Sequence, residues 1–122
     1  MLAPLNISRV VPDIRSKQMD ESRAFYVDFL GFKVGMDMGF ITTFVSPSNP
    51  ASQISVLHDD GSSALLPNVS IEVEDVNKVY ADAMGRGLKI AYPLTDEPWG
   101  VRRFFVVDPS GTVLNIMSHI SR

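Results

Sequence analysis

The sequence predicts an α+β protein made of two βαβββ modules, and three observations support this prediction. Residues 31–34 read Gly-Phe-Lys-Val, and residues 87–90 repeat them as Gly-Leu-Lys-Ile. A stretch of strand-forming residues precedes each copy, at 10–15 and at 69–73. Between each stretch and its copy, apolar residues recur at the spacing of an amphipathic helix. Because one module could not bury its sheet face alone, we expect both to pack into one curved mixed sheet around a cavity.

A chain of 122 residues is expected to form a single domain covering residues 1–122. Module one spans about residues 8–58 and module two about residues 66–119. A polar segment near residues 58–64 joins them.

The first module begins with the strand at 10–15 and continues with a helix. Asp20 is the predicted N-cap of this helix, and Ala24, Val27 and Leu30 form its apolar stripe. Gly31 is predicted to end the helix, because glycine readily adopts the left-handed conformation found there. Three strands are expected to follow, at 33–38, 41–46 and 53–57.

The second module repeats this pattern with clearer signals. Its helix is capped by Asp75, ends at Gly87 and has an apolar stripe of Val76, Val79, Tyr80 and Ala83. Asp-Pro-Ser-Gly at 108–111 predicts a tight turn between strands. The strands of this module are expected at 69–73, 89–94, 102–107 and 113–118.

Composition argues against several classes of partner. The net charge is −3 and the basic residues are not clustered, so we expect no nucleic-acid binding. The N-terminus lacks the pattern of a signal peptide, and no apolar run is long enough to span a membrane. The chain contains no cysteine, which excludes disulfides and thiolate chemistry and fits the cytoplasm.

Four sequence segments, in this order along the chain, suggest a known family. They are Ser-Arg-Ala-Phe-Tyr at 22–26 followed by Phe-Leu-Gly-Phe at 29–32, Ile-Glu-Val-Glu-Asp-Val at 71–76, Pro-Trp-Gly-Val-Arg at 98–102 and Asp-Pro-Ser-Gly-Thr-Val-Leu-Asn at 108–115. Together with the internal repeat, they resemble the vicinal oxygen chelate superfamily of glyoxalases, bleomycin-resistance proteins and extradiol dioxygenases. The resemblance covers nearly the whole chain, and its segments are typical of the superfamily rather than of one reaction.

The resemblance implies four positions at which such proteins hold a divalent metal ion through His, Glu or Gln. In this sequence those positions carry Val11, Ser55, Asn68 and Asn115. Valine cannot coordinate a metal, and Asn or Ser bind divalent transition metals poorly beside imidazole and carboxylate. We therefore expect no metal cofactor. The chain is in this respect most similar to bleomycin-resistance-like members, which sequester a drug in clefts shared by two subunits.

These observations favour a homodimeric protein that binds a small organic molecule without a metal. The alternative is an enzyme with non-standard ligands, either a metal-dependent lyase or isomerase or an extradiol-type dioxygenase. A third reading is an accessory domain with a collapsed cavity. No catalytic residue is assigned. The two histidines, His58 and His119, are interpreted as solvated residues at a strand end and in the tail.

Several residues are candidates for the ligand site. Trp99 lies in an acidic loop that the resemblance places beside the cleft, although it could instead anchor that loop on the sheet. One of the neighbours Arg102 and Arg103 is expected to face the cavity, and Arg102 fits the family segment better. Its alternative role is a surface ion pair.

The remaining candidates have equally open alternatives. Asn68, Asn115 and Ser55 could hydrogen-bond a ligand, one another or a trapped water. Phe44 and Tyr92 are predicted to form cavity wall or core.

Overall fold

The computed structural model describes residues 6–62 and 64–120, and within them it has the predicted α+β class and the doubled βαβββ order. The first half contains β1 (Ile7–Ser16), α1 (Met19–Ala24), its π-helical continuation η1 (Phe25–Phe29), β2 (Lys33–Asp37), β3 (Ile41–Val45) and β4 (Gln53–His58). The second half contains β5 (Val69–Val73), α2 (Val76–Gly85), β6 (Ile90–Asp96), β7 (Val101–Val107) and β8 (Val113–His119). No helix in this described part is long and apolar enough to cross a membrane.

The hydrogen-bonded order of the strands is β2-β3-β4-β1-β5-β8-β7-β6. In each half the first strand runs parallel to the last, as β1 with β4 and β5 with β8. The other strand pairs within each half are antiparallel. The two halves therefore share one topology, as the sequence repeat predicts.

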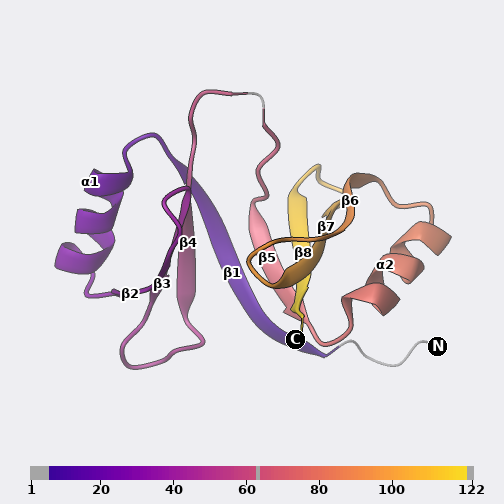
Figure 1. The fold of residues 1–122 in the computed structure, drawn as a ribbon, viewed down its shortest axis with the longest axis horizontal. Helices are drawn as coiled ribbons and strands as arrows, with labels where there is room; N and C mark the ends of the chain where they lie inside the picture. The colour runs from indigo at the N-terminus through magenta and orange to yellow at the C-terminus, as the bar shows by residue number, and fades with distance from the viewer. Residues whose placement is uncertain (1–5, 63, 121–122) are drawn as a thin grey trace. The chain divides into compact units, whose positions relative to one another are not determined.

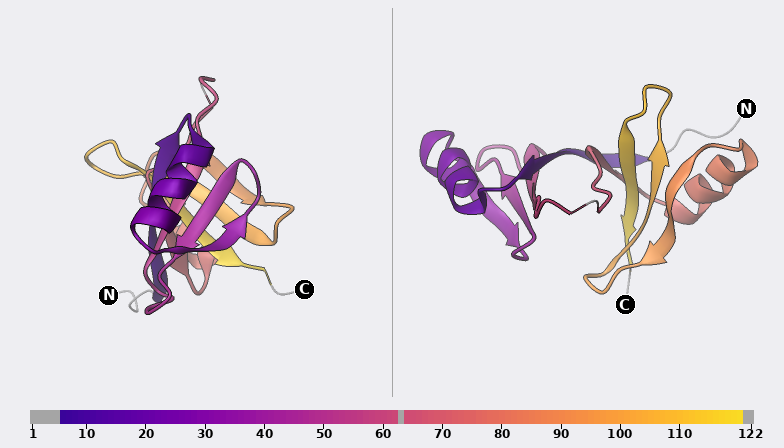
Figure 2. Two further views of the ribbon diagram at one scale, coloured as in Figure 1. Left: turned by 90° about the vertical axis from the view of Figure 1, so that its left-hand side faces the viewer. Right: turned by 90° about the horizontal axis from the view of Figure 1, so that it is seen from above.

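The chain forms two compact units (Figure 1). The module-one unit is Val11–Leu66, and the module-two unit comprises the residues up to Val10 together with those from Pro67 onward. Each helix lies beside strands of its own unit, α1 near β4 and α2 near β6, β7 and β8 (Figure 2).

The core of the module-two unit forms between α2 and one face of its sheet. Its fully buried members are Val73, Val76, Ala83, Phe104 and Ile116. The ring of Tyr80 meets the ring of Phe104 edge-on, with 4.9 Å between centroids. Val79 and Tyr80 also pack against this cluster, so the predicted apolar stripe of α2 is confirmed.

The helix ends match the sequence predictions in three places of four. The Asp75 side chain accepts a hydrogen bond from the Lys78 amide at 3.2 Å, which confirms it as the N-cap of α2. Gly87 and Gly31 follow α2 and η1 with φ angles of 68° and 84°, the left-handed conformation expected at a helix end. The predicted cap at Asp20 is wrong. The helix already begins at Met19, so the Asp20 side chain lies within its first turn.

The module-one unit has its own core on the helix side of the sheet. Phe44 and Val56 are each only 1% exposed, and Tyr26 stacks on Phe44 with 5.2 Å between ring centroids. On the other face, the hydroxyls of Thr43 and Ser55 are hydrogen-bonded at 2.8 Å. The two faces of this sheet therefore differ in kind, with aromatic packing on one and paired hydroxyls on the other.

The turn before β8 carries a pH-dependent part of the stability. Asp108 Oδ1 accepts hydrogen bonds from the Ser110 hydroxyl at 2.6 Å and from the amides of Ser110 and Thr112, each at 2.9 Å. These bonds, that of the Ser110 hydroxyl first, lower the pKa of Asp108 below its ordinary value of 3.8. A carboxyl whose pKa is lower in the folded state stabilises the fold above its unfolded pKa. That stabilisation is lost as the pH falls through the folded pKa.

Asp108→Asn is therefore expected to lower the midpoint of urea unfolding at about pH 7, where the wild-type carboxylate is charged. At about pH 3 the difference between variant and wild type should shrink, because the wild-type carboxyl is then partly protonated. Urea titrations followed by circular dichroism at both pH values measure this. A difference of the same size at both would show that the charge plays no part.

Candidate functional site

The sheet face of the module-two unit that points away from α2 carries polar and aromatic side chains. Residues paired directly across neighbouring strands lie on the same face of a sheet. One such row runs Ser70, Asn115, Phe105 and Tyr92, and the next runs Glu72, Met117, Arg103 and Thr95. We call these eight residues the polar face. The residues between them in sequence, such as Phe104 and Ile116, point to α2.

Arg103 lies at the centre of an aromatic group on the polar face. Its guanidinium carbon is 4.9 Å from the ring centroid of Phe105, 5.1 Å from that of Trp99 and 5.4 Å from that of Tyr92. These distances are within the range of cation–π attraction. The Arg103 Nε is buried and has no hydrogen-bond partner among the described residues.

Glu97 fixes this group from the loop between β6 and β7. Its carboxylate accepts a hydrogen bond of 2.6 Å from the Tyr92 hydroxyl and lies 3.7 Å from Arg103 Nη2. The loop is closed by a hydrogen bond of 2.8 Å from the Glu97 amide to the Val101 carbonyl. A carboxylate thus balances the charge of Arg103 and holds it in place.

Asn115 provides a second unpaired atom on the same face. It is 8% exposed, and its Nδ2 donates to the Ser70 hydroxyl at 3.0 Å. Its Oδ1 is buried without a hydrogen-bond partner in the described part of the chain. Leaving such an acceptor unpaired costs about 1–3 kcal/mol. On β8, Asn115 lies two residues before Met117, the residue paired with Arg103. The side chains of Arg103 and Asn115 are therefore diagonal neighbours, roughly 7–8 Å apart.

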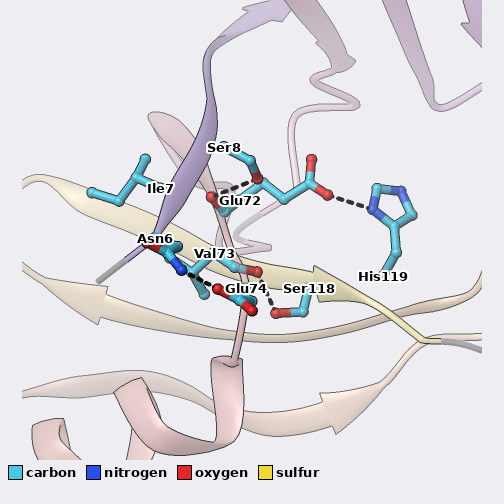
Figure 3. Close-up of a pocket in the computed structure, with 8 residues that line it drawn as sticks. All are labelled: Asn6, Ile7, Ser8, Glu72, Val73, Glu74, Ser118 and His119. Carbon is cyan, nitrogen blue, oxygen red and sulfur yellow. Dashed lines mark hydrogen bonds and ion pairs between the residues drawn. The ribbon is translucent and has the colours of Figure 1, made fainter. Parts of the chain in front are cut away.

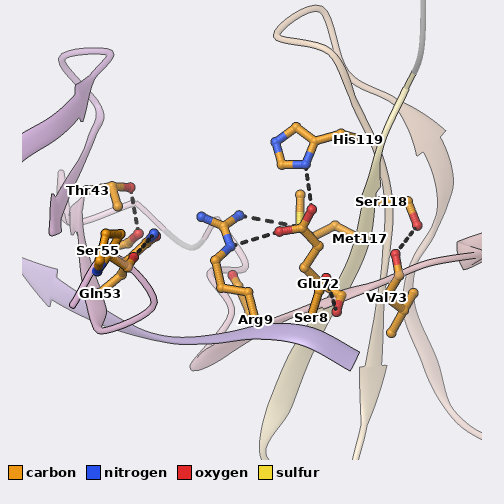
Figure 4. Close-up of polar contacts among 12 residues, drawn as sticks. Ser8, Arg9, Thr43, Gln53, Ser55, Glu72, Val73, Met117, Ser118 and His119 are labelled. Atoms are coloured by element: carbon orange, nitrogen blue, oxygen red, sulfur yellow. Dashed lines mark hydrogen bonds and ion pairs between the residues drawn. The ribbon is translucent and has the colours of Figure 1, made fainter. Parts of the chain in front are cut away.

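One edge of the polar face is charged. Glu72 Oε1 lies 2.9 Å from Arg9 Nε, and its Oε2 lies 2.7 Å from His119 Nδ1 (Figure 4). Arg9 Nη2 also contacts the Met117 sulfur at 3.9 Å. One carboxylate therefore binds a guanidinium and an imidazole that lie far apart in the sequence.

A pocket of about 580 Å³ opens beside this carboxylate (Figure 3). Strands β1, β5 and β8 and the residues next to them form its walls. The lining residues are Asn6, Ile7, Ser8, Glu72, Val73, Glu74, Ser118 and His119.

Comparison with known proteins identifies the family. The model of the Glyoxalase/Bleomycin resistance protein/Dioxygenase superfamily matches residues 6–116 of this chain. The chain belongs to this superfamily. The resemblance drawn from the four sequence segments is thereby confirmed. Among curated proteins, no sequence matches this superfamily member.

Solved structures with this fold include proteins of different activities. A glyoxalase/bleomycin resistance protein/dioxygenase superfamily member from Vibrio splendidus 12B01 is 19% identical, with a TM-score of 0.69, and the match covers 94% of this chain and 99% of that one. The methylmalonyl-CoA epimerase of Mycobacterium tuberculosis is 16% identical, with a TM-score of 0.71, over 99% of this chain and 94% of that one. An extradiol ring-cleaving dioxygenase from B. fuscum is 20% identical, with a TM-score of 0.72, over 99% of this chain but 35% of that one. Identities this low show that the fold is shared, and the fold by itself does not determine the reaction.

The side chains at the four implied metal positions do not fit a divalent transition metal. Val11 is 3% exposed and has no donor atom. The Ser55 hydroxyl is bonded to Thr43, and the Asn68 Oδ1 accepts from the Val113 amide at 3.0 Å. Asn115 alone keeps a buried oxygen unpaired, and a neutral amide is a weak ligand for such ions. Within residues 6–62 and 64–120, no group of three or more His, Asp or Glu side chains could hold a metal ion.

Of the predicted ligand-site residues, the structure brings Tyr92, Trp99 and Asn115 to the polar face or its rim. The register of β7 places Arg102, the arginine preferred from the sequence, on the sheet face opposite to Asn115 and Arg103. Arg102 bonds Asp96 at 2.5 Å and Asn77 of α2 at 3.2 Å, so it lies on the helix side. The hydrogen-bonded carboxylate of Asp96 raises the pKa of Arg102. This is the ion-pair alternative left open by the sequence.

The other three predicted ligand-site residues, Phe44, Asn68 and Ser55, do not belong to the polar face. Phe44 belongs to the core beneath Tyr26, on the helix side of the module-one sheet. Asn68 is exposed at the start of β5, where its side chain caps the first amide of β8. Ser55 lies in the module-one unit, bonded to Thr43.

Sequence reasoning missed the charged edge formed by Arg9, Glu72 and His119. The sequence predicts a solvated His119, and its side chain is 61% exposed, but its ring is also bonded to Glu72. A signal was present, because His119 is four residues after Asn115 and therefore on the same face of a strand. The parallel pairing of β5 with β8, which brings Glu72 beside it, is not visible in the sequence.

Proposed function

We propose that this superfamily member binds a small organic molecule on the polar face of its module-two unit without a metal ion. The observation that carries the proposal is the pair of buried unpaired atoms, Arg103 Nε and Asn115 Oδ1, on one sheet face. Buried polar atoms are almost always hydrogen-bonded to protein, water or ligand. A ligand that supplied an acceptor and a donor would satisfy both atoms.

The surroundings of Arg103 favour a ligand with a flat ring. Trp99 and Tyr92 present large rigid surfaces beside the guanidinium, and indole and phenol groups contribute contact area at little entropic cost. Trp99 is 37% exposed, and its ring lies against the Arg103 guanidinium. A ligand that displaced the Trp99 side chain would therefore reach Arg103. Aromatic acids and amides combine a ring with the polar atoms required.

We further propose that the protein is a homodimer, as the superfamily's drug-sequestering members suggest. The cysteine-free composition suggests that it acts in the cytoplasm. Exposed apolar side chains on the helix of module one, led by Phe29 at 73% exposure, support an interface there. Sedimentation velocity measures the oligomeric state, and a monomer at all concentrations would contradict the dimer.

A ligand screen combined with metal analysis tests the binding proposal. Untagged protein is analysed for bound Fe, Mn, Ni and Zn. It is then screened by thermal shift with aromatic carboxylates and aromatic amides, with and without EDTA. We expect no stoichiometric metal and a ligand-induced rise in the unfolding temperature that EDTA leaves unchanged. A ligand at 100 times its Kd stabilises the native state by about 2.7 kcal/mol, enough for a clear shift.

Trp99, the only tryptophan, provides a second readout, because a ligand beside Arg103 should change its fluorescence. A tightly held transition metal, together with ligand binding that EDTA abolishes, would instead favour a metal-dependent enzyme. In that case the proposal of metal-free binding is wrong.

A further inference from the structure

The Glu72–His119 pair at the pocket beside the polar face has the geometry of a catalytic dyad. His119 Nδ1 lies 2.7 Å from Glu72 Oε2. A carboxylate can only accept a hydrogen bond here, so Nδ1 must carry the hydrogen. In the neutral ring the other nitrogen, Nε2, then keeps a lone pair and accepts protons. His119 lines the pocket, and its exposed side chain is accessible to solvent and solutes (Figure 3).

The carboxylate that orients His119 is itself held on its other side. Arg9 Nε forms an ion pair with Glu72 Oε1 at 2.9 Å (Figure 4). The Glu72 side chain is 22% exposed, so water screens this pairing less than at an open surface. Arg9 Nη2 also lies 3.9 Å from the Met117 sulfur.

The other polar groups of the pocket already have partners. The Ser118 hydroxyl donates to the Val73 carbonyl at 2.6 Å and accepts from the Val76 amide at 3.1 Å. Glu74 accepts a hydrogen bond from Asn6. The imidazole of His119 is therefore the group best placed to react with a molecule in the pocket, whose apolar wall is formed by Ile7 and Val73.

We propose that His119 acts as a general base in this pocket and supports hydrolysis of small activated esters, with Glu72 as its positioning residue. His119 Nε2 takes a proton from a water molecule as the water oxygen bonds to the ester carbonyl carbon. The bond from that carbon to the alkoxy oxygen then breaks, and the proton passes from Nε2 to the departing oxygen. Acid and alcohol are released, and the histidine returns to its starting state. This activity goes beyond ligand binding and uses none of the four implied metal positions.

The hydrolysis of 4-nitrophenyl acetate tests this proposal. We expect wild-type protein to exceed an equal concentration of N-acetylhistidine by at least about tenfold, since a positioned general base contributes about 10²–10⁴-fold in enzymes. His119→Gln should reduce the rate to the level of N-acetylhistidine. His58→Gln is the matched control, because His58 is exposed at the end of β4 and belongs to neither site. It should change the rate less than twofold.

The tautomer of His119 is a readout that an ordinary surface histidine would not show. Long-range ¹H–¹⁵N spectra should find the hydrogen of the neutral ring on Nδ1 in the wild type. In Glu72→Ala it should move largely to Nε2, with the ester hydrolysis rate falling at the same time. A wild-type ring with its hydrogen on Nε2, or equal rates for His119→Gln and wild type, would overturn the proposal. The ligand-induced thermal shift is measured separately, so failure of the dyad and failure of the binding site are distinguishable.

Discussion

Phe104→Ala is expected to lower the free energy of unfolding by about 3–5 kcal/mol, the range for removing a fully buried aromatic ring. Phe104 is 0% exposed and packs between α2 and the module-two sheet, against Tyr80. Alanine would leave a cavity that neither α2 nor β7 can fill without breaking other contacts. The free energy of unfolding of a domain is only about 5–15 kcal/mol in total, so the variant should lose a large fraction of its stability.

Urea unfolding followed by circular dichroism and by Trp99 fluorescence measures this loss. Phe104→Leu is the control, since it keeps most of the buried volume and should cost less than about 1.5 kcal/mol if the core can repack. A loss below that value for the alanine variant would show that Phe104 is not enclosed as the structure describes.

Arg103→Ala is expected to weaken binding of the aromatic acid or amide identified by thermal shift by at least about tenfold, or 1.4 kcal/mol. The variant removes the buried Nε and the cation that lies over the rings of Phe105, Trp99 and Tyr92. Titration followed by Trp99 fluorescence or by calorimetry measures the affinity. Unfolding temperature without ligand checks that the loop held by Glu97 remains folded.

Arg102→Ala provides a closely matched control. It removes the same charge from the neighbouring residue, but Arg102 lies on the helix side with Asp96 and Asn77. Its affinity for the ligand should equal that of the wild type. If Arg102→Ala abolished binding and Arg103→Ala did not, the ligand would lie on the other face of the sheet. The preference for Arg102 drawn from the sequence would then be right after all.

Local and periodic features of the chain were readable in advance. The repeat at 31–34 and 87–90, the apolar stripe of α2, the cap at Asp75 and the left-handed Gly87 all involve residues close in sequence. Spacing and backbone preference determine such features with little help from the rest of the fold. The superfamily could be predicted from the sequence for the same reason, because the four segments that resemble it are short and contiguous.

The candidate site was only partly predictable. Tyr92, Trp99 and Asn115 were named from the sequence and do lie together around Arg103. Phe44 was named as well, but it packs under Tyr26. A strand shifted by one residue presents the opposite set of side chains, so choosing between neighbours requires the register.

The sequence by itself therefore determined the order and class of the elements, the doubled topology and the family. Only the tertiary structure decided that Arg103 rather than Arg102 joins Asn115, and that Arg9 and His119 share the carboxylate of Glu72. The physical reason is that helices and turns depend on neighbours along the chain. The contents of a sheet face depend instead on which distant strands pair and in what register.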